Sequence, residues 1–181
     1  MKNSKTKFLY AIGIALIIIQ GFTFKTDDKK LVLFSASGFV EGVTMRSADI
    51  SGLEKVTKDG KDGGIKFRTE SNDSRLVLQH FPIDAGKYKS IHIRFSKRPF
   101  QRFETLYFYF ITDVDKNYGK DKGNFVPIVD KADEAVINLE LIPTWKGKIV
   151  GTRINFGQVK GSDVTVEEIY YSTDPAPTPV K

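Results

Sequence analysis

From residue 31 onward the chain consists of short apolar or alternating runs, each closed by a cluster of turn-forming residues. The clusters, such as DGKDGG, SNDS and VKGSD, are rich in Gly, Asn and Asp, which supply the backbone angles of tight turns. About nine short strands at this spacing predict an all-β fold, an antiparallel β-sandwich or jelly roll. The runs are LVLF (31–34), GIKFR (64–68), RLVLQHF (75–81), SIHIRFS (90–96), TLYFYFIT (105–112), NFVPIV (124–129), AVINLEL (135–141), GTRINFG (151–157) and TVEEIYYS (165–172).

Alternation within the runs assigns side chains to faces. In SIHIRFS, Ile91, Ile93 and Phe95 point one way and the polar side chains point the other. The run 105–112 is apolar or aromatic on both faces, so we expect a central strand whose outer face is partly covered. Residues 39–60 fit no single pattern and are compatible with a long loop, a short strand or one helical turn.

The first 24 residues have the arrangement of an export signal. MKNSKTK supplies a charged start, and the apolar run 8–24 is close to the shortest length, about 17 residues, that can span a membrane. A cleaved signal peptide and an uncleaved membrane anchor are both open, and membrane contact is expected only if the segment is uncleaved. In either case residues 25 onward lie outside the cytoplasm, in the periplasm, at the cell surface or secreted. We assign residues 25–174 to the sandwich and the Pro-rich residues 175–181 to a solvated tail.

Charge and cysteine content exclude several classes of function. The formal net charge is +6, but Lys2, Lys5 and Lys7 of the leader supply three of these charges. The small excess on the rest of the chain does not predict a nucleic-acid partner. The chain has no cysteine, which excludes disulfides, a thiol nucleophile and thiolate metal sites.

Catalytic motifs are absent from the sequence. His80 and His92 are the two histidines, and neither has a neighbour in sequence that would orient it as a base. No nucleophile elbow, zinc-spaced motif or phosphate-binding glycine loop occurs. No pair of carboxylates stands in a setting that would raise the pKa of one of them, as glycoside hydrolysis requires. We therefore predict a protein that is not an enzyme.

Several segments resemble the galactose-binding-like jelly rolls of bacterial carbohydrate-binding modules. FPIDAGKYKSIHIRFSKRP (81–99) is similar to a turn of the form IDA-x-x-Y followed by a strand of the form I-x-I-R. TWKGKIVGTRINFG (144–157) is similar to the W-K-G-x-I turn and strand, and VTVEEIYYS (164–172) looks like the closing strand. The resemblance spans roughly residues 31–172 and implies the sandwich fold more strongly than any ligand.

The chain departs from this family pattern at a few positions. Relatives often have an acidic residue and a tryptophan near the start, where this chain has Ser35 and Val43. The usual Asp-Tyr pair of the closing strand is altered at Ile169, and Thr152 stands where a leucine is usual. The changes at Val43 and Ile169 favour an alternative function, a structural or assembly protein of the cell envelope that uses the same sandwich to bind a protein partner.

Trp145, the single tryptophan, stands between a Pro-Thr corner and a Lys-Gly turn. It could be an exposed platform for a sugar ring or a plug that seals one end of the core. The resemblance implies a recurring structural residue, and a buried indole contributes a large apolar area. We favour the plug and keep Trp145 among the candidate ligand residues.

Other aromatic and basic side chains complete the predicted ligand site, which would hold a glycan or cell-surface polysaccharide. Sugars stack on aromatic rings while polar groups bind their hydroxyls, and arginine makes bidentate contacts to carboxylate or sulfate, which would suit an acidic glycan. Alternatively, the aromatic residues near position 100 fold back over the sandwich edge while the nearby cations stay in water. The candidate ligand residues are Arg94, Arg98, Phe100, Arg102, Tyr107, Tyr109, Tyr118 and Trp145.

Two places offer ligands for one structural calcium ion, the only cofactor that we consider. The segment DVDKNYGKDKGN (113–124) carries closely spaced oxygen ligands, but its glycine is displaced from the EF-hand position and no Glu closes the loop. We expect a solvated connection there. The other place is Glu41 together with Glu168, because relatives often hold a structural calcium in the corresponding position.

Overall fold

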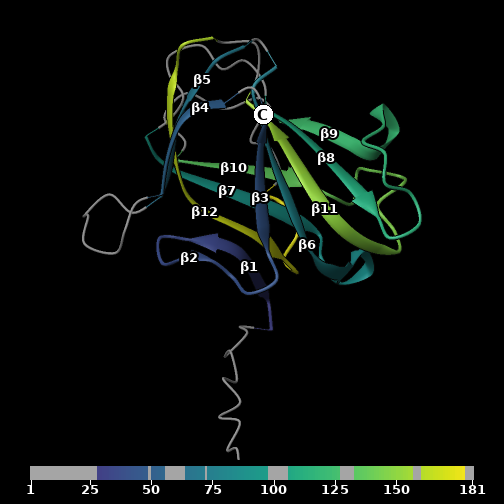
Figure 1. Ribbon diagram of the computed structural model, residues 1–181. Coiled ribbons are helices and arrows are strands. Elements are labelled where there is room, and N and C mark those ends of the chain that lie inside the picture. Colours follow the sequence, from purple (N-terminus) through teal and green to yellow (C-terminus); the bar gives the residue numbers. More distant parts are fainter. Residues whose placement is uncertain are drawn as a thin grey trace, which may run out of the picture.

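The computed structural model describes residues 28–48, 50–55, 64–71, 73–97, 106–126, 133–156 and 160–177, which form two antiparallel sheets (Figure 1). The seven-stranded sheet contains β1 (Lys30–Ser35), β2 (Gly38–Phe39), β4 (Ile50–Lys55), β5 (Ile65–Thr69), β7 (Ser90–Lys97), β10 (Glu134–Asn138) and β12 (Asp163–Ser172). The five-stranded sheet contains β3 (Thr44–Ala48), β6 (Arg75–Asp84), β8 (Leu106–Thr112), β9 (Gly123–Val126) and β11 (Lys148–Asn155). Two short 3-10 helices, η1 (Ala85–Lys87) and η2 (Lys120–Lys122), follow β6 and precede β9.

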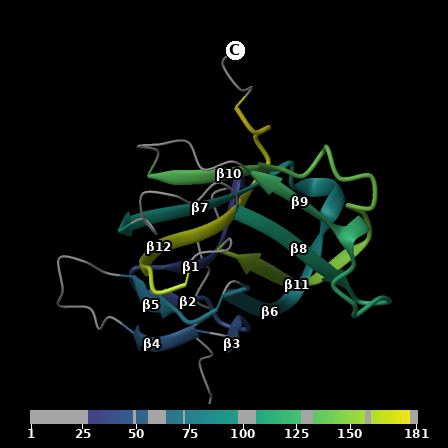
Figure 2. The same cartoon turned by 90° about the horizontal axis from the view of Figure 1, so that it is seen from above.

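The two sheets lie against each other as layers (Figure 2). The five-stranded sheet has the order β3-β6-β11-β8-β9, so β8 is an interior strand, as the apolar character of both its faces predicts. In the seven-stranded sheet, β12 pairs with β7 along one edge. The other edge of β12 pairs with two strands: β5 pairs with residues 163–166 of β12, and β1 pairs with residues 169–172. The predicted all-β antiparallel sandwich is confirmed.

Residues 39–60, which had no clear pattern, contain two edge strands. β3 pairs with β6 at the edge of the five-stranded sheet, and β4 pairs with β5 at the edge of the other. The chain therefore changes sheets between these strands. Edge strands are covered on fewer sides than central ones, so their sequence has less reason to alternate between apolar and polar.

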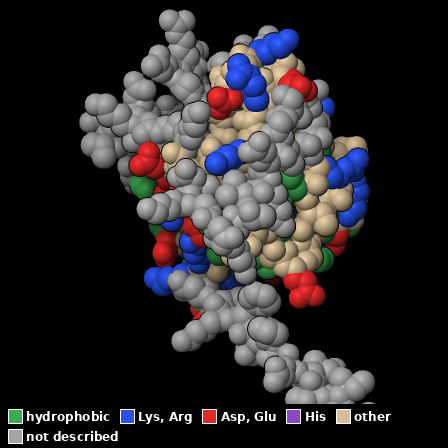
Figure 3. All heavy atoms as spheres, turned by 60° about the vertical axis from the view of Figure 1, so that its left-hand side comes forward, with side chains coloured by type: hydrophobic (Ala, Val, Ile, Leu, Met, Phe, Trp, Pro, Cys, Tyr) green, Lys and Arg blue, Asp and Glu red, His purple; other side chains and the backbone are tan. Residues whose placement is uncertain are grey.

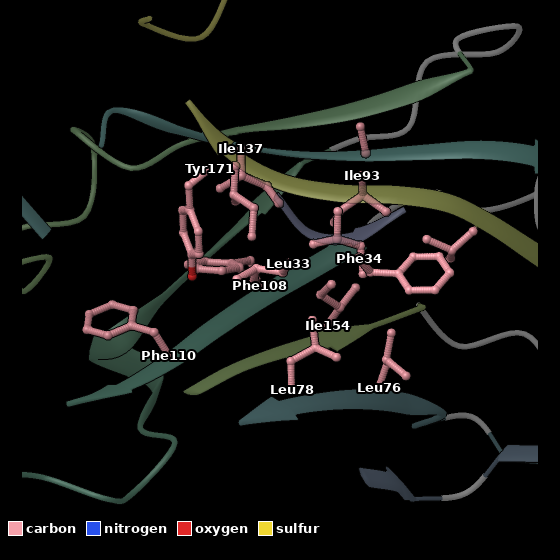
Figure 4. Close-up of a cluster of buried hydrophobic side chains, with 14 of the residues drawn as sticks. Leu33, Phe34, Leu76, Leu78, Ile93, Phe108, Phe110, Ile137, Ile154 and Tyr171 are labelled. Carbon is pink, nitrogen blue, oxygen red and sulfur yellow. The ribbon is translucent and has the colours of Figure 1, made fainter. Parts of the chain in front are cut away.

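The core fills the space between the layers (Figure 4). Ile91, Ile93 and Phe95 of β7 all point into it, as their alternation predicts. Each large apolar side chain buried in this way contributes about 1.5–3 kcal/mol, which is how a chain without cysteine is held together. The largest fully buried side chains are Tyr171, Phe108, Phe110, Phe156, Leu33, Leu76, Leu78, Ile91, Ile93, Leu106, Ile137 and Leu139.

A chain of polar groups crosses this apolar core. The Nδ1–H of His80 donates to the Phe81 carbonyl at 2.9 Å, since a carbonyl can only accept, and this leaves Nε2 to accept from the Thr152 hydroxyl at 3.1 Å. Thr152 in turn accepts from the Tyr171 hydroxyl at 2.6 Å. Burial lowers the pKa of His80, which keeps the ring neutral. These hydrogen bonds link β6 and β11 of one sheet to β12 of the other. They give the hydroxyl of Thr152 a structural role at a position where the sequence pattern leads one to expect leucine.

Basic and acidic side chains lie among each other over the side drawn in Figure 3. Within the residues that the structure describes, no helix has the length and apolar character needed to cross a bilayer. The predicted leader lies outside those residues.

Candidate functional site

The outer face of the five-stranded sheet carries a row of side chains that is aromatic at one end. Directly paired residues of antiparallel strands point to the same face. Asn155 of β11 pairs with Arg75 of β6 on one side and Tyr107 of β8 on the other. Tyr107 pairs in turn with Phe125 of β9, and their ring centroids are 6.3 Å apart. Phe125 is 62% exposed, so the row ends in an open aromatic surface.

A second row, two residues further along the strands, is centred on Arg153. Arg153 of β11 lies between Val77 of β6 and Tyr109 of β8, and Val77 pairs with Arg46 of β3. The Arg153 guanidinium carbon is 5.0 Å from the centroid of the Tyr109 ring and 5.9 Å from that of Tyr118. At these distances the cation is attracted to both rings. We call the two rows together with Tyr118 the five-stranded face.

Tyr118 reaches this face from the loop between β8 and η2. Gly151 makes room for it, because a Cβ atom there would lie 3.0 Å from the Tyr118 hydroxyl oxygen and 2.8 Å from Ile111. The hydroxyl is buried and has no hydrogen-bond partner among the described residues. Burial raises the pKa of Tyr118, and the positive charges of Arg153 and Arg46 oppose this increase.

The arginines of this face share one carboxylate. Asp73 accepts a hydrogen bond from Arg75 Nη1 at 3.0 Å and lies 3.7 Å from Arg153 Nη2. Asp73 also accepts from the Asn155 amide, whose own oxygen accepts from Arg153 Nε at 2.7 Å. With Arg46 added, three arginines face one acidic residue across these described rows, which leaves the surface positively charged.

The loop that carries Tyr118 is held by an internal ammonium group. Lys122 is buried, donates to the Asn117 carbonyl at 2.7 Å and pairs with Asp115. The hydrogen bond from Lys122 and that from the Asn117 N–H lower the pKa of Asp115. Asp115, one of the oxygen ligands that the sequence offers for calcium, therefore contacts a lysine in this structure.

The outer face of the seven-stranded sheet is organised differently. Glu168 accepts from Lys30 Nζ at 2.7 Å and from Arg94 Nη1 at 3.3 Å. The Tyr170 hydroxyl donates to Glu134 Oε1 at 3.0 Å, and burial together with this bond raises the pKa of the phenol. The charges of this group are thus balanced within the protein. We call Lys30, His92, Arg94, Glu134, Glu168 and Tyr170 the seven-stranded face.

The aromatic rings of the seven-stranded face are already covered. The His92 ring stacks on Tyr170 with centroids 4.5 Å apart and an angle of 10°. Lys30 Nζ lies 3.8 Å from the centroid of the same tyrosine ring. A stacked ring and an ammonium group this close cannot share one side, so both sides of Tyr170 are occupied. The His92 Nδ1 atom faces Glu134 at 3.2 Å.

The structure divides the predicted ligand residues between regions. Tyr107, Tyr109 and Tyr118 come together on the five-stranded face, whereas Arg94 belongs to the seven-stranded face. These two groups lie on different sheets, so they do not form one site. The remaining basic and aromatic candidates, Arg98, Phe100 and Arg102, lie outside the described residues.

Trp145 forms the plug rather than the platform. Its indole N–H is shared between the carbonyls of Ala85 at 2.9 Å and Tyr88 at 3.1 Å. The ring meets Phe110 edge-on at 5.0 Å and stacks on Tyr171 at 5.7 Å between centroids. It therefore seals one end of the core and takes no part in the aromatic rows.

Sequence reasoning missed the polar and charged members of the five-stranded face and one ring: Arg46, Arg75, Arg153, Asn155 and Phe125. Alternation does place Arg75 and Arg153 opposite buried leucine and isoleucine within their runs. What the sequence lacks is the pairing of β11 between β6 and β8, which sets these side chains beside the tyrosines.

The predicted calcium ligands lie in unlike surroundings. Glu41 is exposed in the turn after β2, and Glu168 is held by Lys30 and Arg94. An ion bound to Glu168 would have to displace these two cations. Among the described residues there is no group of three or more His, Asp or Glu that could hold a metal. Calcium at this place stays a prediction.

No model of a protein family and no curated protein sequence matches the chain. Solved structures do match it. A mutant of a family 29 carbohydrate-binding module is 10% identical, with a TM-score of 0.55, over 84% of this chain and 99% of that one. Another family 29 mutant, in complex with cellulohexaose, is 10% identical, with a TM-score of 0.54, over 81% and 92%.

A further match is a low-affinity xylan-binding module of family 86 from Roseburia intestinalis, 11% identical over 72% of this chain and 94% of that one. Its TM-score is 0.46. The family 29 structures show that the chain has the β-sandwich fold of carbohydrate-binding modules, as the galactose-binding-like sequence resemblance implies.

Proposed function

We propose that the protein is an exported, non-catalytic module that binds a polysaccharide on its five-stranded face. One observation carries this proposal: two adjacent cross-strand rows set Tyr107 and Phe125 beside Tyr109 and Arg153. The fold shared with carbohydrate-binding modules supports it. The buried and neutral state of His80 supports a binding role over catalysis, because a general base must reach its substrate.

The rows suit an extended sugar chain. Tyr107 and Tyr109 are two residues apart on one strand, which separates them by about 6.4–6.8 Å on the same face. Neighbouring sugar residues of one chain can therefore stack on neighbouring rings. Gln79 and Arg153 lie on the same face in β6 and β11, and their amide and guanidinium groups can bond the hydroxyls.

Affinity electrophoresis through gels that contain neutral or acidic polysaccharides tests the proposal. We expect at least one polysaccharide to retard the protein, and Phe125→Ala to lose most of that retardation. Leu141→Ala is the matched control, because Leu141 is also a large exposed apolar residue, 69% against 62%, and lies in the β10–β11 loop outside the rows. No retardation on any gel, or equal losses in both variants, would contradict the proposal.

Two further measurements test its other parts. Fractionation of cells that produce the full chain should recover the protein outside the cytoplasm, and a purely cytoplasmic location would contradict export. Pull-down from solubilised envelope tests the alternative function. A stoichiometric protein partner, together with no glycan retention, would replace glycan binding by envelope assembly.

A further inference from the structure

The five-stranded face carries an excess of positive charge in the same two rows as its aromatic rings. Arg46, Arg75 and Arg153 belong to these rows, and among the described residues Asp73 is an acidic residue that contacts the last two. At the far end of the same sheet Lys148 is neutralised by Asp84 at 3.0 Å. That pair adds no net charge to its end of the sheet.

Two of these arginines have hydrogen-bonding capacity left for a ligand. Arg46 is exposed, and its side chain makes no hydrogen bond or ion pair with a described residue. Arg153 uses Nε on Asn155, and its Nη2 faces Asp73 at 3.7 Å, beyond hydrogen-bonding distance. A guanidinium carries five N–H donors, so most of those on Arg153 are uncommitted within the described part of the chain.

Arg153 is also held in position before any ligand arrives. Its side chain is 19% exposed and is fixed by the Asn155 amide and by the Tyr109 and Tyr118 rings. Ordering a long side chain on binding usually costs affinity, and here that ordering is already present. The Tyr118 ring, whose centroid lies 5.9 Å from the Arg153 guanidinium carbon, carries a buried hydroxyl with no partner among the described residues.

Two guanidinium groups on one face, each with donors that no described residue uses, fit an anion. We propose that the five-stranded face selects anionic polysaccharides, with Arg46 and Arg153 binding a carboxylate or sulfate group while Tyr107, Tyr109 and Phe125 stack on the sugar rings. This inference rests on the proposed function and names its substrate class. Guanidinium groups bind such planar or tetrahedral oxyanions in a bidentate manner that neutral hydroxyls cannot match.

The experiment compares polygalacturonate with its methyl ester, which has the same sugar backbone without the charge. By calorimetry or affinity electrophoresis we expect the wild-type protein to bind the acid about tenfold or more tightly than the ester, as expected for hydrogen bonds to a charged group. Dextran and dextran sulfate form a second pair. If the protein prefers the acidic polymer only in the polygalacturonate pair, the bound group is a carboxylate. If it does so only in the dextran pair, the bound group is a sulfate.

Arg46→Gln is the decisive variant, because Arg46 is exposed and its replacement leaves the core intact. We expect it to lower affinity for the acidic polymer about tenfold and to change affinity for the ester less than twofold. Arg153→Lys keeps the positive charge but removes the planar guanidinium group. It should lower affinity for the acidic polymer by less than Arg46→Gln does. Arg68→Gln is the matched control: it removes the same charge from β5 of the other sheet, where Arg68 pairs with Asp163, and should change neither affinity.

The outcomes separate the two proposals. Equal binding of acid and ester would overturn the anion selectivity and leave glycan binding intact. No binding to any polysaccharide would overturn the proposed function itself. An equal loss in Arg46→Gln and Arg68→Gln, or equally tight binding of a single-stranded oligonucleotide, would show a general charge effect instead of a site and would also overturn the inference.

Discussion

The two outer faces of the sandwich are both built from tyrosines and cations, yet they are arranged in opposite ways. On the seven-stranded face, Tyr170 has His92 stacked on one side and Lys30 on the other. On the five-stranded face, Phe125 remains 62% exposed at the end of its row, and Arg153 lies against Tyr109 and Tyr118. Composition alone does not distinguish these surfaces.

The difference lies in the supply of carboxylates. Glu134 and Glu168 satisfy the hydroxyl and the cations of the seven-stranded face from within the same sheet. On the five-stranded face, among the described residues, Asp73 is shared by Arg75 and Arg153, and Arg46 has no carboxylate partner there. A surface that satisfies its own polar groups gains little from a ligand, whereas one with spare donors and open rings gains from each contact.

The largest expected difference between the faces follows from replacing one tyrosine on each. Tyr109→Ala removes a ring that would stack on sugar and that also positions Arg153. We expect a loss of about 1.5–3 kcal/mol in glycan binding, which is tenfold or more. Tyr170→Ala removes a ring that likewise contacts a cation, at 3.8 Å from Lys30, and should leave binding unchanged. Titration calorimetry measures the glycan affinity of both variants, and melting curves confirm that both are folded. Equal losses of affinity would show that the two faces do not differ in glycan binding.

The polar chain between the sheets is common to both faces, so disturbing it should lower stability without affecting one face alone. Thr152→Val leaves His80 Nε2 and the Tyr171 hydroxyl without a partner in the core. We expect the free energy of unfolding to fall by about 1–3 kcal/mol. Urea denaturation measures the loss, and Thr152→Ser, which keeps a hydroxyl, should recover most of it. A neutral effect of Thr152→Val would show that the chain adds nothing to stability.

The charge network of the seven-stranded face should give a smaller effect. Glu168→Gln leaves Lys30 and Arg94 without their shared carboxylate. Arg94 is about half exposed, so screening by water limits the loss to about 0.5–1 kcal/mol of unfolding free energy. The difference from wild type should shrink at high salt, as measured by urea denaturation in both conditions. A change in glycan affinity would contradict the separation of the faces.

A pH dependence of stability should be the weakest effect and should belong to the interior. Burial lowers the pKa of His80 below its ordinary value of 6.5, so the unfolded chain binds a proton that the folded one does not. This contribution is complete above pH 6.5 and is lost as the pH falls from there toward the folded pKa. Denaturation midpoints at pH 7.5 and 5.5 should differ less in His80→Gln than in wild type. Equal differences would assign the pH dependence to other groups.

The strands and their buried faces follow from the sequence because alternation is a local property. Ile91 and Ile93 are one example, and Phe108 and Phe110 are another. The site depends on which strands become neighbours, which no local pattern encodes. Arg94 and Tyr107 were both predicted as ligand residues, yet β7 and β8 belong to different sheets.

The family resemblance predicted the residues that hold the fold together, but it did not predict the residues of the candidate site. It implied that Trp145 recurs as part of the fold, and the indole indeed donates to backbone carbonyls of the other matched segment, at Ala85 and Tyr88. The matched sequence motif also includes Arg153, but the resemblance assigns no function to this residue. That role appears only when β11 is placed between β6 and β8.

The pairing of β1 with β12 has a mechanical consequence. Lys30 lies opposite Ser172, and the Thr173 N–H donates to the Lys29 carbonyl at 2.9 Å, so both flanking segments leave from the same end of one antiparallel ladder. A force applied through both segments would open this ladder one bond after another, like a zipper, rather than load all its bonds at once.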